Sequence, residues 1–296
     1  MENSISIVIT SAHEPKTIGR ALKAIINQDC PEILEILIVS PDKKTQNQAK
    51  KASGQSKKIK ILKDPGRGKP AALNFALKQT QGQVIILTDG DVFLAPNALK
   101  PLLAPFKNPR VGGTCGRPVP TNNKKTLFGF WAHFLTDSAD QIRKETSSKN
   151  GFIELSGYLL AIKKEVYSEI PEKTLADDSH LSHLVAQAGF VSKYVPRAKV
   201  FVKYPTNLAD WFKQKKRSAF EYLNKKYSSG NKMRTPLKEI ILGFRYALAY
   251  PKNLSQFLWL ILLFGARLFL WGQILFLNLV PGSKEKLWQP VPSTKS

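Results

Sequence analysis

The sequence predicts an α/β protein with a mixed, mostly parallel central sheet flanked by helices. Short runs of β-branched and aliphatic residues, typical of buried strands, alternate with segments whose apolar residues recur at helical spacing. The alternation continues over roughly the first ninety residues, as expected for parallel strands joined by right-handed helical crossovers. Polar and acidic clusters follow directly after several of the strand-like runs.

The elements of the first ninety residues can be assigned from these patterns. The expected strands are Ser4–Thr10, Ile33–Val39, Ile59–Leu62 and Gln83–Leu87. The expected helices are Thr17–Asn27 and Pro70–Gln79, with proline in the first turn of the second, and polar Lys43–Lys58 is a surface helix or loop. Ligands of such sheets bind beyond the carboxyl ends of the strands. Glu14, Asp42 and the 89–91 segment are therefore expected along one rim.

The later part of the chain is less regular. The expected strands are Val111–Cys115, Phe152–Ile162 with a turn at Ser156-Gly157, Phe190–Val195 and Ala198–Val202. The expected helices are Leu127–Asp140, Leu181–Ala188 ended by Gly189, and the basic amphipathic Leu208–Tyr227.

Two further helices are predicted after residue 230. Pro236–Tyr250 is amphipathic, and Leu254–Val280 carries one charge, Arg267. As a helix the second segment would measure about 40 Å, which exceeds a hydrocarbon core of about 30 Å. Membrane contact is expected, by spanning, by lying in the interface or by a kinked entry; the alternative is a buried helix of a soluble domain. We expect a domain over residues 1–230 and a membrane-associated region over 231–296.

The composition narrows the class of protein. The chain has 45 basic and 22 acidic residues, a net charge of +23, and residues 203–296 hold 16 of the bases but only 4 of the acids. The electrostatic field of so positive a protein favours binding to phosphates, nucleic acid or anionic lipid. Cys30 and Cys115 are too few for a disulfide scaffold or a cysteine-rich zinc module, and no signal peptide is expected at the amino terminus.

Three motifs carry candidate chemistry. Asp89-Gly90-Asp91 ends a buried strand, where two carboxylates suit Mn²⁺ or Mg²⁺ with phosphate oxygens completing the shell; the alternative is a plain turn. The glycine-rich loop before Lys69 opens a helix, as anion sites do, although an ordinary turn has the same pattern. Adjacent Asp177 and Asp178 open another helix, either as caps or as a general base whose pKa a neighbouring carboxylate raises.

The order of these pieces resembles the inverting glycosyltransferases of family 2, which have the GT-A fold. The segments that carry the resemblance are ISIVITSAHEPKTIGRALKAIINQ, GRGKPAALNFALKQTQGQVIILTDGDVFLAPNAL, SGYLLAIKKEVY, ADDSHLSHLVAQAGF and QKKRS. The resemblance covers about residues 4–220. His13-Glu14 stands where Asn-Glu is usual, and Ser218 replaces a tryptophan that supports the acceptor in polymerising members, which puts processive synthesis in doubt.

The resemblance implies a role for each matching residue. Asp178 would be the catalytic base with Asp177 as its acidic neighbour, and Asp91 with Asp89 would hold the metal ion. The implied nucleotide-sugar contacts are Glu14, Asp42, Lys69, Asn74 and Asp89. The residues implied to contact the acceptor and the diphosphate are Ser156, Gly157, Gln214 and Arg217.

The implied activity is metal-dependent transfer from a nucleotide sugar, with a UDP-sugar favoured and a GDP-sugar as the second candidate. The acceptor is expected to be a glycan or a lipid-linked sugar of cell-envelope polysaccharide biosynthesis, reached from the cytoplasmic face of the inner membrane. Three alternatives remain open: transfer to a polyprenyl phosphate, a relative that has lost catalysis, and a basic protein that binds nucleic acid without a metal. Membrane lipid is an expected partner and nucleic acid is not.

Overall fold

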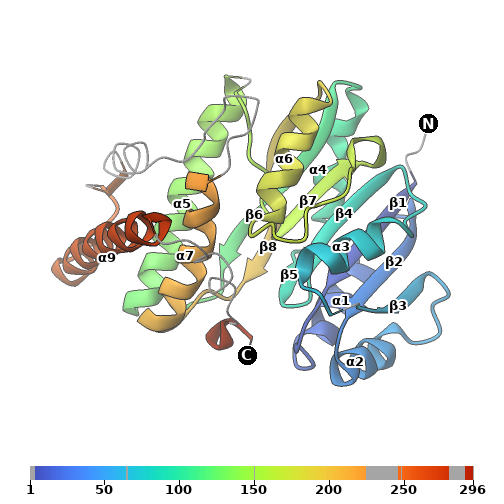
Figure 1. The fold of residues 1–296 in the computed structure, drawn as a ribbon, viewed down its shortest axis with the longest axis horizontal. Helices are drawn as coiled ribbons and strands as arrows, with labels where there is room; N and C mark the ends of the chain where they lie inside the picture. Colours follow the sequence, from blue (N-terminus) through green and yellow to red (C-terminus); the bar gives the residue numbers. More distant parts are fainter. Residues whose placement is uncertain are drawn as a thin grey trace. The chain divides into compact units, whose positions relative to one another are not determined.

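The computed structural model describes residues 4–64, 66–149, 151–224, 246–247, 249–279 and 291–295 (Figure 1). The chain divides into two compact units. The first comprises Met1–Val119, Thr146–Val202 and Lys295–Ser296, and the second comprises Pro120–Glu145 and Lys203–Thr294. The predicted boundary near residue 230 lies outside the described residues and stays a prediction.

The first unit contains an eight-stranded mixed sheet with the strand order β3-β2-β1-β4-β7-β6-β8-β5. Its first four strands are parallel: β1 (Ile5–Thr10), β2 (Ile33–Ser40), β3 (Ile59–Lys63) and β4 (Val84–Asp89). The register sets Thr10 beside both Val39 and Asp89. The carboxyl ends of these strands are therefore level, as the sequence predicted.

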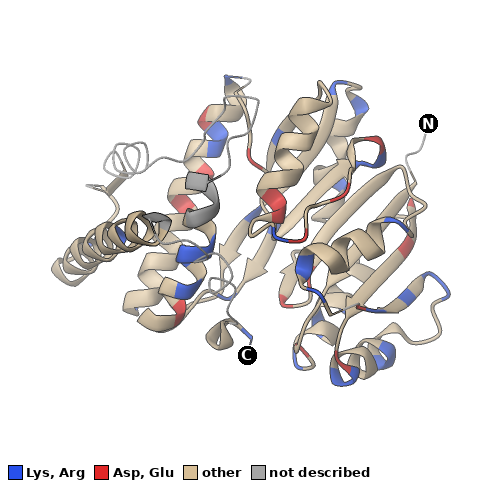
Figure 2. Ribbon diagram, in the orientation of Figure 1, with Lys and Arg blue, Asp and Glu red and all other residues tan. Residues whose placement is uncertain are grey.

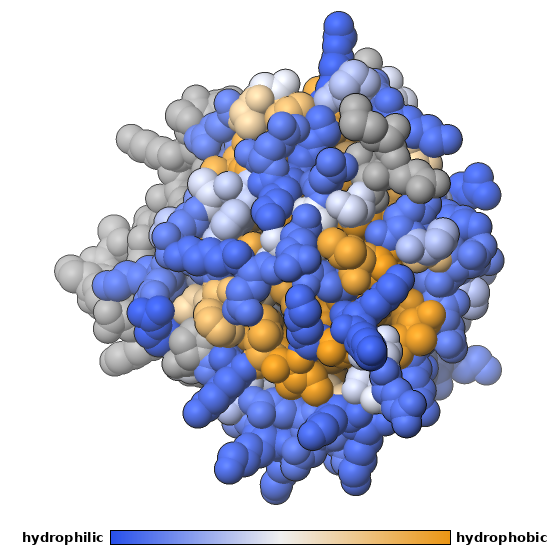
Figure 3. Space-filling view, turned by 90° about the vertical axis from the view of Figure 1, so that its right-hand side faces the viewer, coloured by the Kyte–Doolittle hydropathy of each residue, from blue (hydrophilic) through white to orange (hydrophobic). Residues whose placement is uncertain are grey.

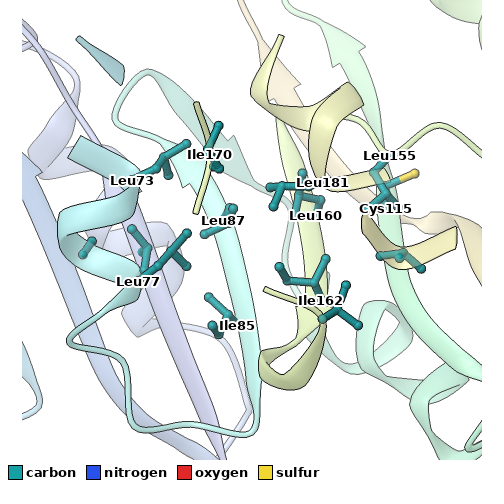
Figure 4. Close-up of a cluster of buried hydrophobic side chains, with 14 of the residues drawn as sticks. Leu73, Leu77, Ile85, Leu87, Cys115, Leu155, Leu160, Ile162, Ile170 and Leu181 are labelled. Carbon is teal, nitrogen blue, oxygen red and sulfur yellow. The ribbon is translucent and has the colours of Figure 1, made fainter. Parts of the chain in front are cut away.

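The helices that connect the parallel strands form because each buries one apolar face. They are α1 (Ile18–Ile26), α2 (Lys43–Ser53) and α3 (Lys69–Leu77). Leu73 and Leu77 of α3 lie against Ile85 and Leu87 of β4 in a cluster of buried side chains (Figure 4). Fully burying each such side chain contributes about 1.5–3 kcal/mol to folding, which fixes α3 and the loop before it on the sheet.

Three pairings in the second half of the sheet are antiparallel: β7 with β4, β6 with β7, and β8 with β5. Its elements are β5 (Val92–Leu94), α4 (Leu99–Leu103), η1 (Ala104–Lys107), β6 (Val111–Pro120), β7 (Leu159–Lys163), η2 (Lys164–Val166), α6 (Asp177–Gln187) and β8 (Val191–Val202).

Three expectations for this half were wrong in detail. The two strands expected around Pro196 form one strand, β8, because proline is tolerated where no ladder hydrogen bond is needed from its nitrogen. The strand expected from Phe152 begins only at Leu159. The helix expected from Leu181 begins four residues earlier, at Asp177.

The second unit contains α5 (Leu127–Ser148, whose last turn belongs to the first unit), α7 (Leu208–Asn224), α9 (Leu254–Leu279) and η4 (Pro292–Thr294). Trp131 of α5 donates its indole N–H to the Trp259 carbonyl at 2.7 Å, and Phe212 of α7 packs edge-on against Phe269 of α9. α9 therefore packs along α5 and α7 within this unit.

One face of α9 remains exposed although it is apolar. Leu254 and Phe276 are 74% and 67% exposed, and Figure 2 shows almost no charge along this helix. By length and composition, Leu254–Leu277 is able to cross a membrane, which alone is weak evidence that it does. The predicted amphipathic helix over Pro236–Tyr250 falls mostly outside the described residues.

The face of the molecule seen in Figure 3 is mostly hydrophilic. In the view of Figure 3, hydrophilic side chains surround a smaller hydrophobic area. The lysines of α2 illustrate this, since its sequence KKTQNQAKKAS buries only Thr45 and Ala49.

Candidate active site at the carboxyl rim of the sheet

Lys69, the first residue of α3, connects the two acidic motifs. Its ammonium nitrogen lies 2.9 Å from Asp89 Oδ1 and 3.5 Å from Asp177 Oδ2. Gly68, which precedes it, has a φ of 96°, a left-handed conformation that favours glycine. The glycine-rich loop thus begins α3 at the point where its lysine reaches both the end of β4 and the start of α6. Figure 2 shows acidic residues at this end of α6 and a basic residue at the start of α3.

Asp178 is held by backbone donors. Gly157 N–H donates to its Oδ2 at 3.0 Å, and Ser179 N–H donates to its Oδ1 at 2.9 Å. A side chain on Gly157 would come within 3.0 Å of the same carboxylate. The Ser156-Gly157 segment therefore lies directly against Asp178, which unites two motifs that are 21 residues apart.

The surroundings of Asp178 favour a proton acceptor. Burial, together with the charges of Asp177 and Glu154, raises the pKa of Asp178 to about 6, and the Gly157 hydrogen bond and Lys69 offset only part of this effect. A carboxylate with a pKa near the working pH is suited to general base catalysis. The sequence predicted the effect of Asp177 but missed Glu154.

Glu154 is a buried acid in the segment before Ser156. Neither of its carboxylate oxygens accepts a hydrogen bond from a described residue, although the side chain is 4% exposed. Burying an unpaired carboxylate is costly, so such groups concentrate at functional sites. The signal that could have found it is the isolated acid in the otherwise apolar FIELSG.

Asp91 lies in a cluster of carboxylates at the rim. Burial and the charges of Glu14 and Asp89 raise the pKa of Asp91 to about 7, while Lys295 and Lys69 lower it. Gly90 packs against the loop after β1, where an added Cβ would lie 2.2 Å from Ser11 Oγ and 2.8 Å from Glu14 Oε2. The absence of a side chain at Gly90 is therefore required by the packing of this loop.

The donor set of this cluster suits a hard divalent ion. No group of three His, Cys, Asp or Glu side chains that could hold a metal ion occurs among the described residues. Magnesium sites in nucleotide enzymes often use only one or two carboxylates together with substrate phosphates. Asp89 and Asp91 supply such a pair, and a cation there would relieve the mutual repulsion of the carboxylates.

Asp42 and Asn74 make structural contacts. Asp42 caps α2 by accepting the Thr45 N–H at 2.9 Å and also accepts the His13 N–H at 2.7 Å. Burial opposes ionisation of Asp42, but these hydrogen bonds hold its pKa below the usual value. Asn74 is buried and pairs with both backbone groups of Ile170, so its carboxamide fixes that segment. Their contacts with a nucleotide sugar stay predictions.

Gln214 and Arg217 lie on α7, in the second unit. The side-chain oxygen of Gln214 is buried and accepts no hydrogen bond from a described residue. Their role on the acceptor and diphosphate side stays a prediction. Lys295 also lies at this rim, because its ammonium nitrogen is 3.1 Å from Glu14 Oε1, and no sequence pattern marks this residue.

Comparison with known proteins identifies relatives of this chain. The chain is 25% identical over 224 residues to the poly-β-1,6-N-acetyl-D-glucosamine synthase of Staphylococcus epidermidis, covering 73% of this chain and 53% of that protein. It is 25% identical to an N-acetylglucosaminyltransferase of Azorhizobium caulinodans, covering 72% of this chain and 58% of that protein. The chain thus spans little more than half the length of these relatives.

Among solved structures, a mannosyltransferase from Pyrobaculum calidifontis, in complex with GDP-Man and Mn²⁺, superimposes with a TM-score of 0.61 at 18% identity. The match covers 96% of this chain and 86% of that one. This likeness confirms the predicted GT-A fold. The model of the family described as "Glycosyl transferase family 2" matches residues 6–169, more than half of the sequence. The chain therefore belongs to glycosyl transferase family 2.

Proposed function

We propose that the protein transfers a sugar from a nucleoside-diphosphate sugar to a hydroxyl group of a glycan or lipid-linked acceptor, with inversion at the anomeric carbon. The observation that carries this proposal is the double ion pair of Lys69 with Asp89 and Asp177, which links a diphosphate site to Asp178. The relatives named as N-acetylglucosaminyltransferases and the neighbour with bound GDP-Man support a nucleotide-sugar donor.

In this mechanism Asp178 removes the proton of the acceptor hydroxyl while that oxygen attacks the anomeric carbon. The bond from this carbon to the diphosphate oxygen breaks on the opposite side, and the nucleoside diphosphate leaves with the electron pair. Lys69 faces the diphosphate side and offsets part of the departing charge. Asp89 and Asp91 would hold a Mn²⁺ or Mg²⁺ ion, which when bound neutralises further negative charge on the leaving group.

Nucleotide binding tests the donor class. We expect one of UDP, GDP, CDP and dTDP to raise the melting temperature of the protein, and only when Mn²⁺ or Mg²⁺ is present. Because a UDP-sugar is the favoured donor, UDP is the favoured nucleotide. At a ligand concentration 100 times the dissociation constant the stabilisation is about 2.7 kcal/mol. Differential scanning fluorimetry with and without EDTA measures it. Stabilisation by none of the four nucleotides would contradict the proposal.

The pH profile tests the base. Because the base must be ionised and its pKa is about 6, we expect kcat to fall as the pH drops through about 6. Glu154→Gln removes a negative charge that raises this pKa, so its acid limb should lie at lower pH. Glu169→Gln, which changes an exposed acid paired with Lys78, should leave the limb in place. An unchanged limb in Glu154→Gln would remove Glu154 from this role.

We also propose that the second unit binds the membrane through the exposed apolar face of α9. Basic residues are dense in this part of the sequence, and anionic lipid attracts each nearby Lys or Arg by about 1 kcal/mol. We expect the protein to float with phosphatidylglycerol liposomes. Three leucines of this face, Leu258, Leu268 and Leu275, are each more than half exposed. The combined variant Leu258→Ser, Leu268→Ser and Leu275→Ser should abolish flotation. Flotation of this variant at the wild-type level would refute the proposal.

A further inference from the structure

Lys295 reaches a loop that lies more than 280 positions earlier in the sequence. Its ammonium nitrogen donates to the Ala12 carbonyl at 2.6 Å and lies 3.1 Å from Glu14 Oε1. The division into compact units places Lys295 with the residues of the first unit, to which this loop belongs. The two contacts are on the segment Ser11–Glu14, which we call the β1 loop.

Glu14 needs a counter-ion at this position. Its carboxylate is 8% exposed and its Oε2 accepts the Ser11 hydroxyl at 2.8 Å. Burial raises the pKa of Glu14, and Lys295 is the largest influence that lowers it. Removing one partner of a buried ion pair leaves an uncompensated charge, which disfavours the local structure. Lys295 therefore stabilises the β1 loop through Glu14.

Other contacts of the β1 loop are with the end of β2 and with α2. Ser11 N–H donates to the Val39 carbonyl at 3.0 Å, and Glu14 N–H donates to Thr45 Oγ1 at 2.9 Å. His13 has a φ of 58°, a left-handed conformation that costs free energy in a residue other than glycine. Its N–H donates to Asp42. A loop with such a residue keeps its shape only where the surroundings hold it.

We infer that Lys295 is a positioning residue for the donor, which holds the β1 loop in the shape that receives the nucleoside. The inference rests on the proposed function, since it assumes a nucleotide sugar at this rim. The contacts of Lys295 with Ala12 and Glu14 are both with the loop, and Glu14 balances its charge. Lys69 instead faces the diphosphate side. Lys295 thus acts on the nucleoside through Ala12 and Glu14.

Binding of two probes tests this division of roles. Calorimetry would measure the affinity for whichever of UDP, GDP, CDP and dTDP the wild-type protein binds, and for inorganic pyrophosphate, both with Mn²⁺. For Lys295→Met we expect nucleotide affinity to fall about tenfold or more, as for loss of a hydrogen bond to a charged group, with pyrophosphate affinity unchanged. Lys295→Arg should recover most of the affinity. Lys100→Met, which breaks an exposed ion pair with Asp29, is the matched control and should change neither.

A double-mutant cycle tests the route of the effect. If Lys295 acts through Glu14, the variant with both Glu14→Gln and Lys295→Met should lose little more affinity than the weaker-binding of the two single variants. Nucleotide affinity of Lys295→Met equal to wild type would overturn the inference. An equal loss of pyrophosphate affinity would also overturn it, because Lys295 would then contact the diphosphate.

Hydrogen exchange separates this inference from the proposed function. Without any nucleotide, amides of residues 11–14 should exchange faster in Lys295→Met than in wild type, while strand β4 keeps its protection and the melting temperature is retained. Unchanged exchange would refute the inference even if the protein bound every nucleotide. Faster exchange in a protein that binds no nucleotide would support the loop contact and refute the donor role together with the proposed function.

Discussion

Replacing Asp178 with asparagine is expected to reduce sugar transfer by about 10²- to 10⁴-fold, the contribution typical of a general base. Asparagine is nearly isosteric and its side-chain oxygen can still accept the Gly157 N–H, so the Ser156-Gly157 segment keeps its support. The substitution removes the capacity to take a proton and the second oxygen, which accepts the Ser179 N–H. Nucleotide binding should remain close to wild type, because Asp178 has no assigned contact with the donor.

Two measurements check this result. Initial rates of transfer from the nucleotide sugar give the loss in kcat, and thermal stabilisation by the nucleotide gives donor binding. Asp29→Asn changes an exposed acid whose partner is Lys100 and serves as the matched control. Full activity in Asp178→Asn would assign the base elsewhere. Loss of nucleotide binding as well would place Asp178 on the donor side of the site.

The parallel half of the fold was predictable because its signals are local. β1, β2 and β4 are rich in aliphatic and β-branched residues, and α1 between β1 and β2 repeats apolar residues at helical spacing. Once these strands are parallel, the sheet itself brings the loop after β1 and the Asp89–Asp91 motif to one rim. The acidic start of α6 was recognised from its motif, although the Lys69 contact that joins it to Asp89 was not foreseen.

The remainder depends on contacts between residues far apart in the chain. β5 has three residues and is a strand because β8 pairs with it, so no local periodicity marks it. Lys295 is one lysine among 45 basic residues, and only the folded chain brings it to Glu14. Glu154 shows the same limit, because its effect on Asp178 arises from packing across 24 positions of sequence. The sequence shows which residues are charged, but local patterns do not predict which of them become partners in the folded chain.

Replacing Asp91 with asparagine is expected to abolish stabilisation of the protein by nucleotide and to raise the stability of the ligand-free protein. Nucleotide with Mn²⁺ should no longer stabilise the protein, which at 100 times the wild-type dissociation constant removes about 2.7 kcal/mol. In EDTA and without nucleotide, the variant should be more stable than wild type. The reason is that the Asp91 carboxylate is buried beside Glu14 and Asp89, so its ionised form is disfavoured in the folded protein.

The pH dependence distinguishes this cause from altered packing. The pKa of Asp91 is about 7 in the folded protein, above the value of about 3.9 in an unfolded chain. The destabilisation is therefore absent below about pH 4, grows as the pH rises, and is complete above about pH 7. Urea unfolding in EDTA should show a gain for Asp91→Asn at pH 8 that shrinks towards pH 5. Asp89→Asn is the control within the same motif: Asp89 is paired with Lys69, so its loss should lower stability. An equal effect of both substitutions would contradict this prediction. It would mean that Asp89, paired with Lys69, and Asp91, buried beside other carboxylates, share one environment.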